Sequence, residues 1–318
     1  MKFSVDPWDP SYGASVETQL DPSEVAVDPT VEVPADAWAP IGAPAAARVE
    51  TVLFVDGVRR IDARVWVEDD AGNADAGVCA SYAAGVVRAA ERAEIVASVV
   101  GRGLFSASRA IRPIPTHYPS VTYQPYAAGD STPEGLWLAI QDQMGRREVE
   151  MAEVARREAP TDALVLLDGP VTSRAHIAEA VGVIKSHATA YLEPELHRFV
   201  GTLPVGARTP LFTIGGRGSR HSWYLRLPGG SEAPWSGVVR CECSAELSVP
   251  AAIELAARVG ATVPRYASEP HKESRAPQNL YPVGGLEREL RRRLGDPDLL
   301  YRALRRSAHA ASTRTAPS

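Results

Sequence analysis

The chain has 318 residues, enough for one large domain or two ordinary ones, and a typical globular share of hydrophobic residues, 45%. No run of 18 apolar residues and no apolar leader segment is found, so we expect a cytoplasmic protein without a membrane span. Three cysteines are too few for a disulfide framework or a zinc site. The net charge is −5, but residues 1–50 hold nine acidic and two basic residues, so the rest of the chain is near neutral, which argues against tight, sequence-independent binding of nucleic acid by this chain alone.

The first segment, residues 1–47, is rich in proline, aspartate and alanine and shows no sustained hydrophobic period. We therefore expect a flexible, extended and acidic N-terminal arm. Trp8 and Trp38 are candidates for anchoring this arm on the rest of the protein or on a partner.

From residue 48 onward the hydrophobic pattern becomes regular and predicts consecutive strands joined by short turns, as in an antiparallel meander. A tight turn is expected at Val58–Arg60, after the first strand. The predicted strands cover residues 50–56, 61–68, 77–87 and 94–100. Residues 106–132 contain several prolines and are expected to form a loop or an accessory segment.

The clearest predicted helix covers residues 133–158, with Thr132 as its N-cap and Pro133 in its first turn. Strands are expected next at 163–168, 180–185, 210–215, 222–227 and 237–243, and helices at 172–179, 193–200, 249–259 and 284–294. Residues 297–318 form a basic C-terminal tail in this prediction. The order of elements predicts an α/β fold, with a mixed sheet flanked by helices and with accessory strands.

Two aspartates end apolar strands and are each followed by glycine: Asp56 and Asp168. A carboxylate at the end of a buried strand lies at the rim of the sheet, where metals and ligands bind. Two such carboxylates on neighbouring strands can share a divalent cation. The alternative for each is a simple turn residue, because Asp-Gly is also a hairpin signal.

The predicted helix 133–158 also offers carboxylates. At 100° per residue, Glu148 lies about 60° and Glu150 about 100° from the centre of the apolar face. Glu148 is therefore the better placed to face a cleft, although most glutamates on such a helix are simply solvated.

Lys185 ends another apolar strand and is one of only three lysines, against 31 arginines. Such a lysine can neutralise a phosphate or orient a nucleophile, or it can extend from the rim of the sheet into water.

Glu287 lies beside the predicted stripe of Leu286, Leu290 and Leu294 and can face a site, or it can simply complement the helix dipole. The arginines that follow make a basic patch suited to phosphate contact or to a solvated surface.

Together these motifs resemble the NurA nuclease family over residues 48–296. The resemblance rests on Phe54-Val55-Asp56-Gly57, the glutamate-bearing helix, Leu166-Leu167-Asp168-Gly169-Pro170, Val183-Ile184-Lys185-Ser186 and Tyr281-Pro282, in this order. Each motif is short, and the agreement lies in their order and spacing.

The resemblance implies an RNase H-like fold and a nuclease dependent on Mn²⁺ or Mg²⁺, with exonuclease and endonuclease activity. It also implies a homodimer that processes DNA ends with a hexameric HerA-type ATPase, in DNA repair or anti-phage defence. By motif, the site residues would be Asp56, Glu148 or Glu150, Asp168, Lys185 and Tyr281.

One departure from the family pattern concerns the position eight residues after the tyrosine. The family often has a histidine there, and this chain has Glu289, with Glu287 nearby. Either glutamate can replace the histidine as a metal ligand, or the site is altered or inactive. With Glu287 chosen, the predicted metal ligands are Asp56, Asp168, Glu148 and Glu287.

Two other functions compete with the nuclease. An actin-like ATPase or sugar kinase also uses Asp-Gly turns, but it needs a Gly/Ser/Thr-rich phosphate loop, which Val58-Arg59-Arg60 matches poorly. A catalytically inactive DNA- or protein-binding module would keep the carboxylates only as turn residues.

Overall fold

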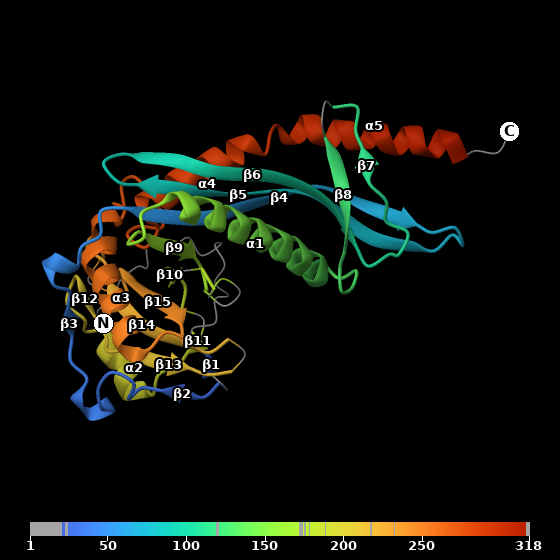
Figure 1. Ribbon diagram of the computed structural model, residues 1–318. Helices are drawn as coiled ribbons and strands as arrows, with labels where there is room; N and C mark the ends of the chain where they lie inside the picture. Colours follow the sequence, from blue (N-terminus) through green and yellow to red (C-terminus); the bar gives the residue numbers. More distant parts are fainter. Residues whose placement is uncertain are drawn as a thin grey trace. The chain divides into compact units, whose positions relative to one another are not determined.

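The computed structural model in Figure 1 describes residues 21–22, 25–118, 121–171, 174, 176–177, 179–187, 189–216, 218–231 and 233–315. By its internal contacts the chain forms two units, each assembled from several stretches of sequence. The first unit contains the residues up to Val55, Val87–Glu94 and Ala155–Gly285. The second contains Asp56–Val86, Ile95–Val154 and the residues from Leu286 onward.

Within the described ranges, thirteen strands belong to one mixed sheet, in the order β2-β13-β14-β15-β10-β9-β4-β5-β6-β8-β7, with β12 paired to β14 and β3 paired to β12. The long strands are β4 (Val52–Glu68), β5 (Ala74–Ala89) and β6 (Ala93–Ser106). The short ones are β2 (Val27–Asp28), β3 (Ile41–Gly42), β7 (Ile114–Pro115), β8 (Thr122–Ala127), β9 (Leu164–Asp168), β10 (Ala180–Ile184), β12 (Ala207–Arg208), β13 (Phe212–Ile214), β14 (Arg220–Arg226) and β15 (Val238–Ser244). A separate pair joins β1 (Asp21–Pro22) to β11 (Thr189–Ala190).

The helices are α1 (Pro133–Glu158), α2 (Pro194–Val200), α3 (Val249–Thr262), α4 (Tyr281–Arg293) and α5 (Pro297–Thr315), with short 3-10 turns at Ala35–Ala37, Ala45–Ala47 and Val263–Tyr266. The predicted α/β class, with a mixed sheet flanked by helices, is therefore confirmed. No helix within the described ranges combines the length and hydrophobicity needed to cross a membrane.

In the first unit, the start of β4 (Val52–Val55) pairs in parallel with β9, and β9 pairs in parallel with β10. These strands are continuous apolar runs because both faces of the sheet are covered there, and Leu164–Leu167 are buried. β10 then pairs antiparallel with β15, so the sheet is mixed.

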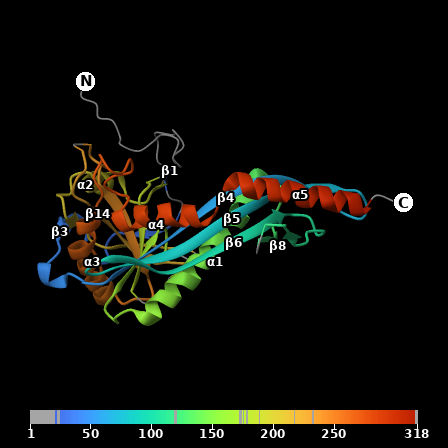
Figure 2. The same cartoon turned by 90° about the horizontal axis from the view of Figure 1, so that it is seen from above.

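In the second unit, the side chains of β5 alternate between two cores, as the pleat of a strand requires. Val78, Ala80 and Tyr82 pack with Leu136, Ile140 and Met144 of α1. On the other face, Cys79 belongs to a cluster with Leu300 and Leu304 of α5. Figure 2 shows α1 and α5 on opposite sides of these strands.

The predicted tight turn at Val58–Arg60 is wrong, because β4 runs without interruption from Val52 to Glu68. Gly57 is needed for packing instead of for a turn. A Cβ placed on it would lie 2.5 Å from Oε1 of Glu148 and 2.8 Å from Cγ of Met144. A glycine inside a strand often marks such a close approach.

Both ends of the chain carry structure beyond what was expected of them. From Val25 on, the acidic arm is part of the first unit: β2 pairs with β13, and Glu32 forms a buried ion pair with Arg208 at 2.8 Å. Trp38 packs against Phe199 and Phe212, whereas Trp8 lies outside the described residues. The basic segment 297–318 contains α5, and segment 106–132 contains β7 and β8. Of the helix expected at 172–179, the structure describes residues 174, 176–177 and 179: Arg174 is in 3-10 helical conformation, and the others lie in turns or a bend.

Candidate metal centre

Asp168 and Lys185 stand at the ends of two parallel neighbours, β9 and β10, where Asp168 lies opposite Val183. Nζ of Lys185 donates to Oδ2 of Asp168 at 2.6 Å and to Oδ1 of Asn279 at 2.8 Å. The side chain of Lys185 is only 8% exposed, which excludes the alternative of a lysine extending from the rim into water. Asn279 did not emerge from the sequence, because a buried asparagine in a Pro/Gly-rich loop has no distinguishing pattern.

The loop after Asp168 is shaped by two glycines. Gly169 has a φ of +100°, and a Cβ on Gly182 would lie 2.6 Å from the carbonyl oxygen of Gly169. Oε1 of the buried Glu242 accepts a hydrogen bond from Val171 N at 2.8 Å. Arg220 and Arg240 in turn pair with Oε2 of Glu242 at 2.9 and 2.7 Å. A buried ion network therefore holds the backbone that follows Asp168.

Asp56 in β4 and Glu148 in α1 are both buried within the second unit, Glu148 at 3% exposure. Oε1 of Glu148 lies against Gly57, the residue after Asp56. Glu150, the other candidate, is exposed and forms an ion pair with Arg147 at 2.7 Å. The structure thus turns Glu148, and not Glu150, toward the strand that carries Asp56.

Glu287 and Glu289 are separated by their surroundings on α4. Glu287 is largely buried, at 9% exposure. Glu289 is held by Arg292 and Arg293, whose hydrogen bonds lower its pKa to about 2. Of the two glutamates, Glu287 is the one whose carboxylate lies near Asp56 and Asp168.

Tyr281 is 38% exposed at the start of α4, and its ring faces Nζ of Lys272 at 5.6 Å. Its predicted place at the site is therefore supported less well than that of the carboxylates.

Three predicted residues come together: Asp56, Asp168 and Glu287 each offer a carboxylate oxygen, and these oxygens lie within 4.8 Å of one another. The strand register explains this, because Val55 pairs with Leu167 and the two aspartates follow directly along β4 and β9. The expected convergence of Asp56 and Asp168 is confirmed. Glu148 is not a member of this group.

The chemistry of the group fits a hard divalent cation. Mg²⁺ and Mn²⁺ prefer carboxylate oxygens, and three ligands leave coordination positions open for water or a substrate oxygen. The formal charges of the three carboxylates and the Lys185 ammonium add up to two negative charges, which one divalent ion would balance. Histidine and cysteine are absent from the group, so nothing in it favours zinc.

No protein-family model matches the chain, and a search of curated proteins also gives no match.

Proposed function

We propose that this protein is a metal-dependent DNA nuclease of the NurA type, with an RNase H-like catalytic fold. The observation that carries the proposal is the group formed by Asp56, Asp168 and Glu287, which come from the interior of β4, the end of β9 and helix α4. Carboxylates from separate elements that meet at one place are a common way to hold ions that act on phosphodiesters.

The order of elements supports the fold part of the proposal. Three consecutive strands, β4, β5 and β6, are neighbours in the sheet, α1 follows them, and β9 and β10 extend the sheet from the other side of β4. This places the first strand of the meander at the centre, next to β9. An RNase H-like site requires this adjacency, because its two strand carboxylates must share a cation.

The proposed roles follow from the positions of the residues. Asp56, Asp168 and Glu287 would hold Mn²⁺ or Mg²⁺, which when bound would activate water and stabilise the charge that builds on the scissile phosphate. Lys185 keeps the Asp168 carboxylate in place and carries the positive charge closest to it. Glu148, buried beside Gly57, is placed to accept a hydrogen bond from a water near Asp56.

Partners form a second part of the proposal. A homodimer working with a hexameric HerA-type ATPase, on DNA ends in repair or anti-phage defence, agrees with the low intrinsic affinity for DNA that the net charge of −5 suggests. An enzyme that receives DNA from a ring-shaped translocase does not need a high DNA affinity of its own.

One observation favours a second candidate, a binding module without catalysis. The Lys185–Asp168 pair already supplies a cation to the acidic group. The ATPase or kinase alternative is weaker. Such an enzyme would need a phosphate-binding loop after Asp56, but β4 continues as a strand through Gly57 and Val58.

The deciding experiment is a cleavage assay on end-labelled single- and double-stranded DNA with Mn²⁺, Mg²⁺ or EDTA. The Asp56→Asn variant is compared with Glu150→Gln, a matched control that alters an exposed carboxylate. Metal-dependent cleavage that Asp56→Asn loses and Glu150→Gln keeps supports the nuclease. A folded wild-type protein that cuts neither DNA with either metal supports the binding module.

A further inference from the structure

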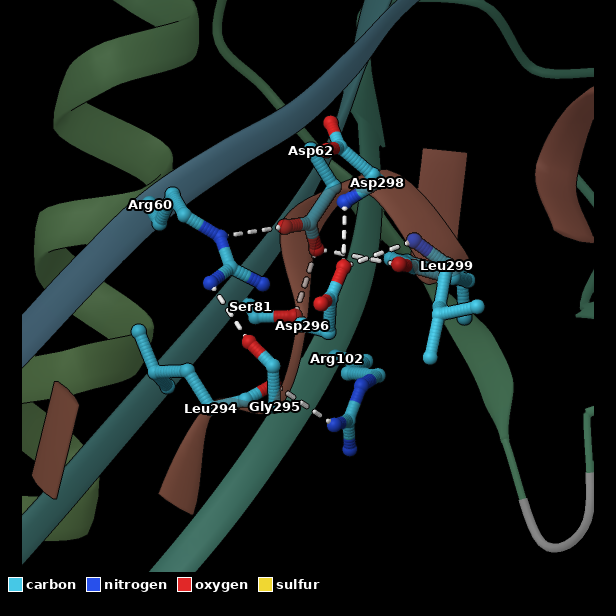
Figure 3. Close-up of polar contacts among 10 residues, drawn as sticks. Arg60, Asp62, Ser81, Arg102, Leu294, Gly295, Asp296, Asp298 and Leu299 are labelled. Carbon is cyan, nitrogen blue, oxygen red and sulfur yellow. Dashed lines mark hydrogen bonds and ion pairs between the residues drawn. The ribbon is translucent and has the colours of Figure 1, made fainter. Parts of the chain in front are cut away.

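Another buried carboxylate, Asp62, has no part in the chemistry proposed above. It lies in β4 within the second unit, and its side chain is completely buried. Its Oδ1 accepts from Nε of Arg60 at 2.8 Å, and its Oδ2 accepts from the hydroxyls of Ser81 at 2.5 Å and Tyr123 at 2.9 Å. Figure 3 shows Arg60 and Ser81 converging on Asp62.

Burying a carboxylate costs free energy unless hydrogen-bond donors surround it. The three donors around Asp62 therefore indicate that its buried charge has a structural or functional role. Burial and the negative charge of Asp62 raise the pKa of the Tyr123 hydroxyl well above its ordinary value. The same two causes raise the pKa of the nearby Cys79 thiol to about 12. Tyr123 therefore remains protonated and keeps donating to Asp62.

The guanidinium that Asp62 orients reaches the end of helix α4. Nη1 of Arg60 donates to the carbonyl of Gly295 at 2.8 Å, and Nη2 of Arg102 in β6 donates to the carbonyl of Leu294 at 3.0 Å. These carbonyls directly follow α4, and Gly295 ends it with a φ of +81°. Carbonyls at a helix C-terminus lack partners within the helix and carry partial negative charge, so two arginines are well suited to hold them.

Helix α4 has a second point of attachment closer to its start. A Cβ on Gly85 of β5 would lie 3.2 Å from Cδ1 of Leu286 and 3.2 Å from Cδ2 of Leu290. The helix therefore rests directly on the strand, where a glycine leaves room for it. Glu287 lies next to this attachment, and seven residues, about 10 Å of helix, separate it from Leu294.

We propose that Asp62 is a positioning residue for Glu287: it orients Arg60, which fixes the end of the helix that carries Glu287. This inference rests on the proposed metal-dependent nuclease. Asp62 lies six residues from Asp56 along β4, about 20 Å, so it acts only through the helix. Arg60 and Asp56 belong to the same strand. The hydrogen bond from Arg60 to the end of α4 therefore fixes Glu287 relative to the strand that carries Asp56, the other proposed ligand.

The test uses Asp62→Asn, which keeps the shape of the side chain and removes its charge. Arg60→Lys is the second variant, since it keeps a cation beside Asp62 but lacks the second arm that reaches Gly295. The matched control is Asp142→Asn, which breaks an exposed Asp–Arg pair on α1. For each protein, Mn²⁺ affinity is measured by calorimetry, and kcat and KM for a DNA substrate are measured at limiting and saturating Mn²⁺.

We expect Mn²⁺ affinity to fall by about 10–100-fold in Asp62→Asn and Arg60→Lys, as is typical when a residue that orients a metal ligand without binding the metal is replaced. KM for DNA should be unchanged, and saturating Mn²⁺ should restore most of the lost kcat. Asp142→Asn should match the wild type. If Asp62→Asn does not fold, Arg60→Lys decides the result.

Two negative results have different meanings. A folded Arg60→Lys variant that melts earlier but binds Mn²⁺ and cleaves DNA as the wild type does overturns the positioning role alone. A wild-type protein that neither binds Mn²⁺ nor cleaves DNA overturns the proposed function and the role of Asp62 with it.

Discussion

Replacing Lys185 with methionine should destabilise the metal-free protein because it removes the counter-charge of Asp168. Methionine keeps the apolar stem, so the loss is mainly electrostatic. Removing one partner of a buried ion pair costs about 3–5 kcal/mol. Asp168 is 20% exposed and keeps some contact with water, so we expect about 2–4 kcal/mol. For a domain of 150–250 residues this is a drop on the order of 4–16 °C in the melting midpoint.

Added Mn²⁺ should reverse this loss, because the ion takes over the neutralisation of Asp168. A ligand at 100 times its Kd stabilises the folded state by about 2.7 kcal/mol, and we expect a larger Mn²⁺-induced shift in Lys185→Met than in the wild type. The assay is thermal unfolding followed by circular dichroism, with and without Mn²⁺. Lys272→Met, which removes an exposed lysine paired with Glu269, is the matched control.

A double-mutant cycle with Asp168→Asn completes the experiment, since the two losses should not add if the residues interact. The reasoning is refuted if Lys185→Met melts at the wild-type temperature without metal. It is also refuted if Mn²⁺ stabilises Asp168→Asn as strongly as it stabilises the wild type.

Three further predictions concern the residues around the acidic group. Asp56→Asn and Asp168→Asn should each lower Mn²⁺-dependent cleavage by more than about 100-fold while the circular dichroism spectrum is retained, because each loses a charged ligand but keeps its shape. Glu148→Gln should slow cleavage whereas Glu150→Gln should not, and equal rates in this assay would contradict the assignment of Glu148. Gly182→Ala should lower the free energy of unfolding by about 1–3 kcal/mol in urea titrations, since its Cβ would meet the backbone of Gly169; unchanged stability would show that the loop can move.

Where local signals agreed with tertiary packing, the sequence predicted the fold well. The predicted helix 133–158 has the bounds of α1, and Oγ1 of Thr132 accepts from Gly135 N at 3.1 Å, as an N-cap should. The Asp-Gly hairpin signal at Asp56–Gly57 failed because packing against Met144 and Glu148 required the glycine. A one-dimensional pattern cannot distinguish a glycine that allows a turn from one that makes room for a helix.

The candidate site was predictable to the extent that it depends on positions along strands and on helix faces. Asp168 ends its strand as predicted, whereas Asp56 lies inside β4. The angular argument selected Glu148 over Glu150, and the burial of Glu148 agrees with it. The ambiguity between Glu287 and Glu289 could have been reduced from the sequence, because Arg292 and Arg293 lie three and four residues after Glu289. Asn279 and Glu242 could not be found in this way, since their partners are distant in sequence.

The choice of lysine at position 185 has a physical explanation in a chain that otherwise uses arginine for 31 of its 34 basic residues. The ammonium fits between Asp168 and Asn279, two oxygen acceptors at 2.6 and 2.8 Å, while its side chain stays almost fully buried. A guanidinium is broader and presents its donors in a fixed plane, so it would leave donors unsatisfied in this space. The buried Lys185 and the three converging carboxylates are thus best understood together, as parts of one arrangement of charge.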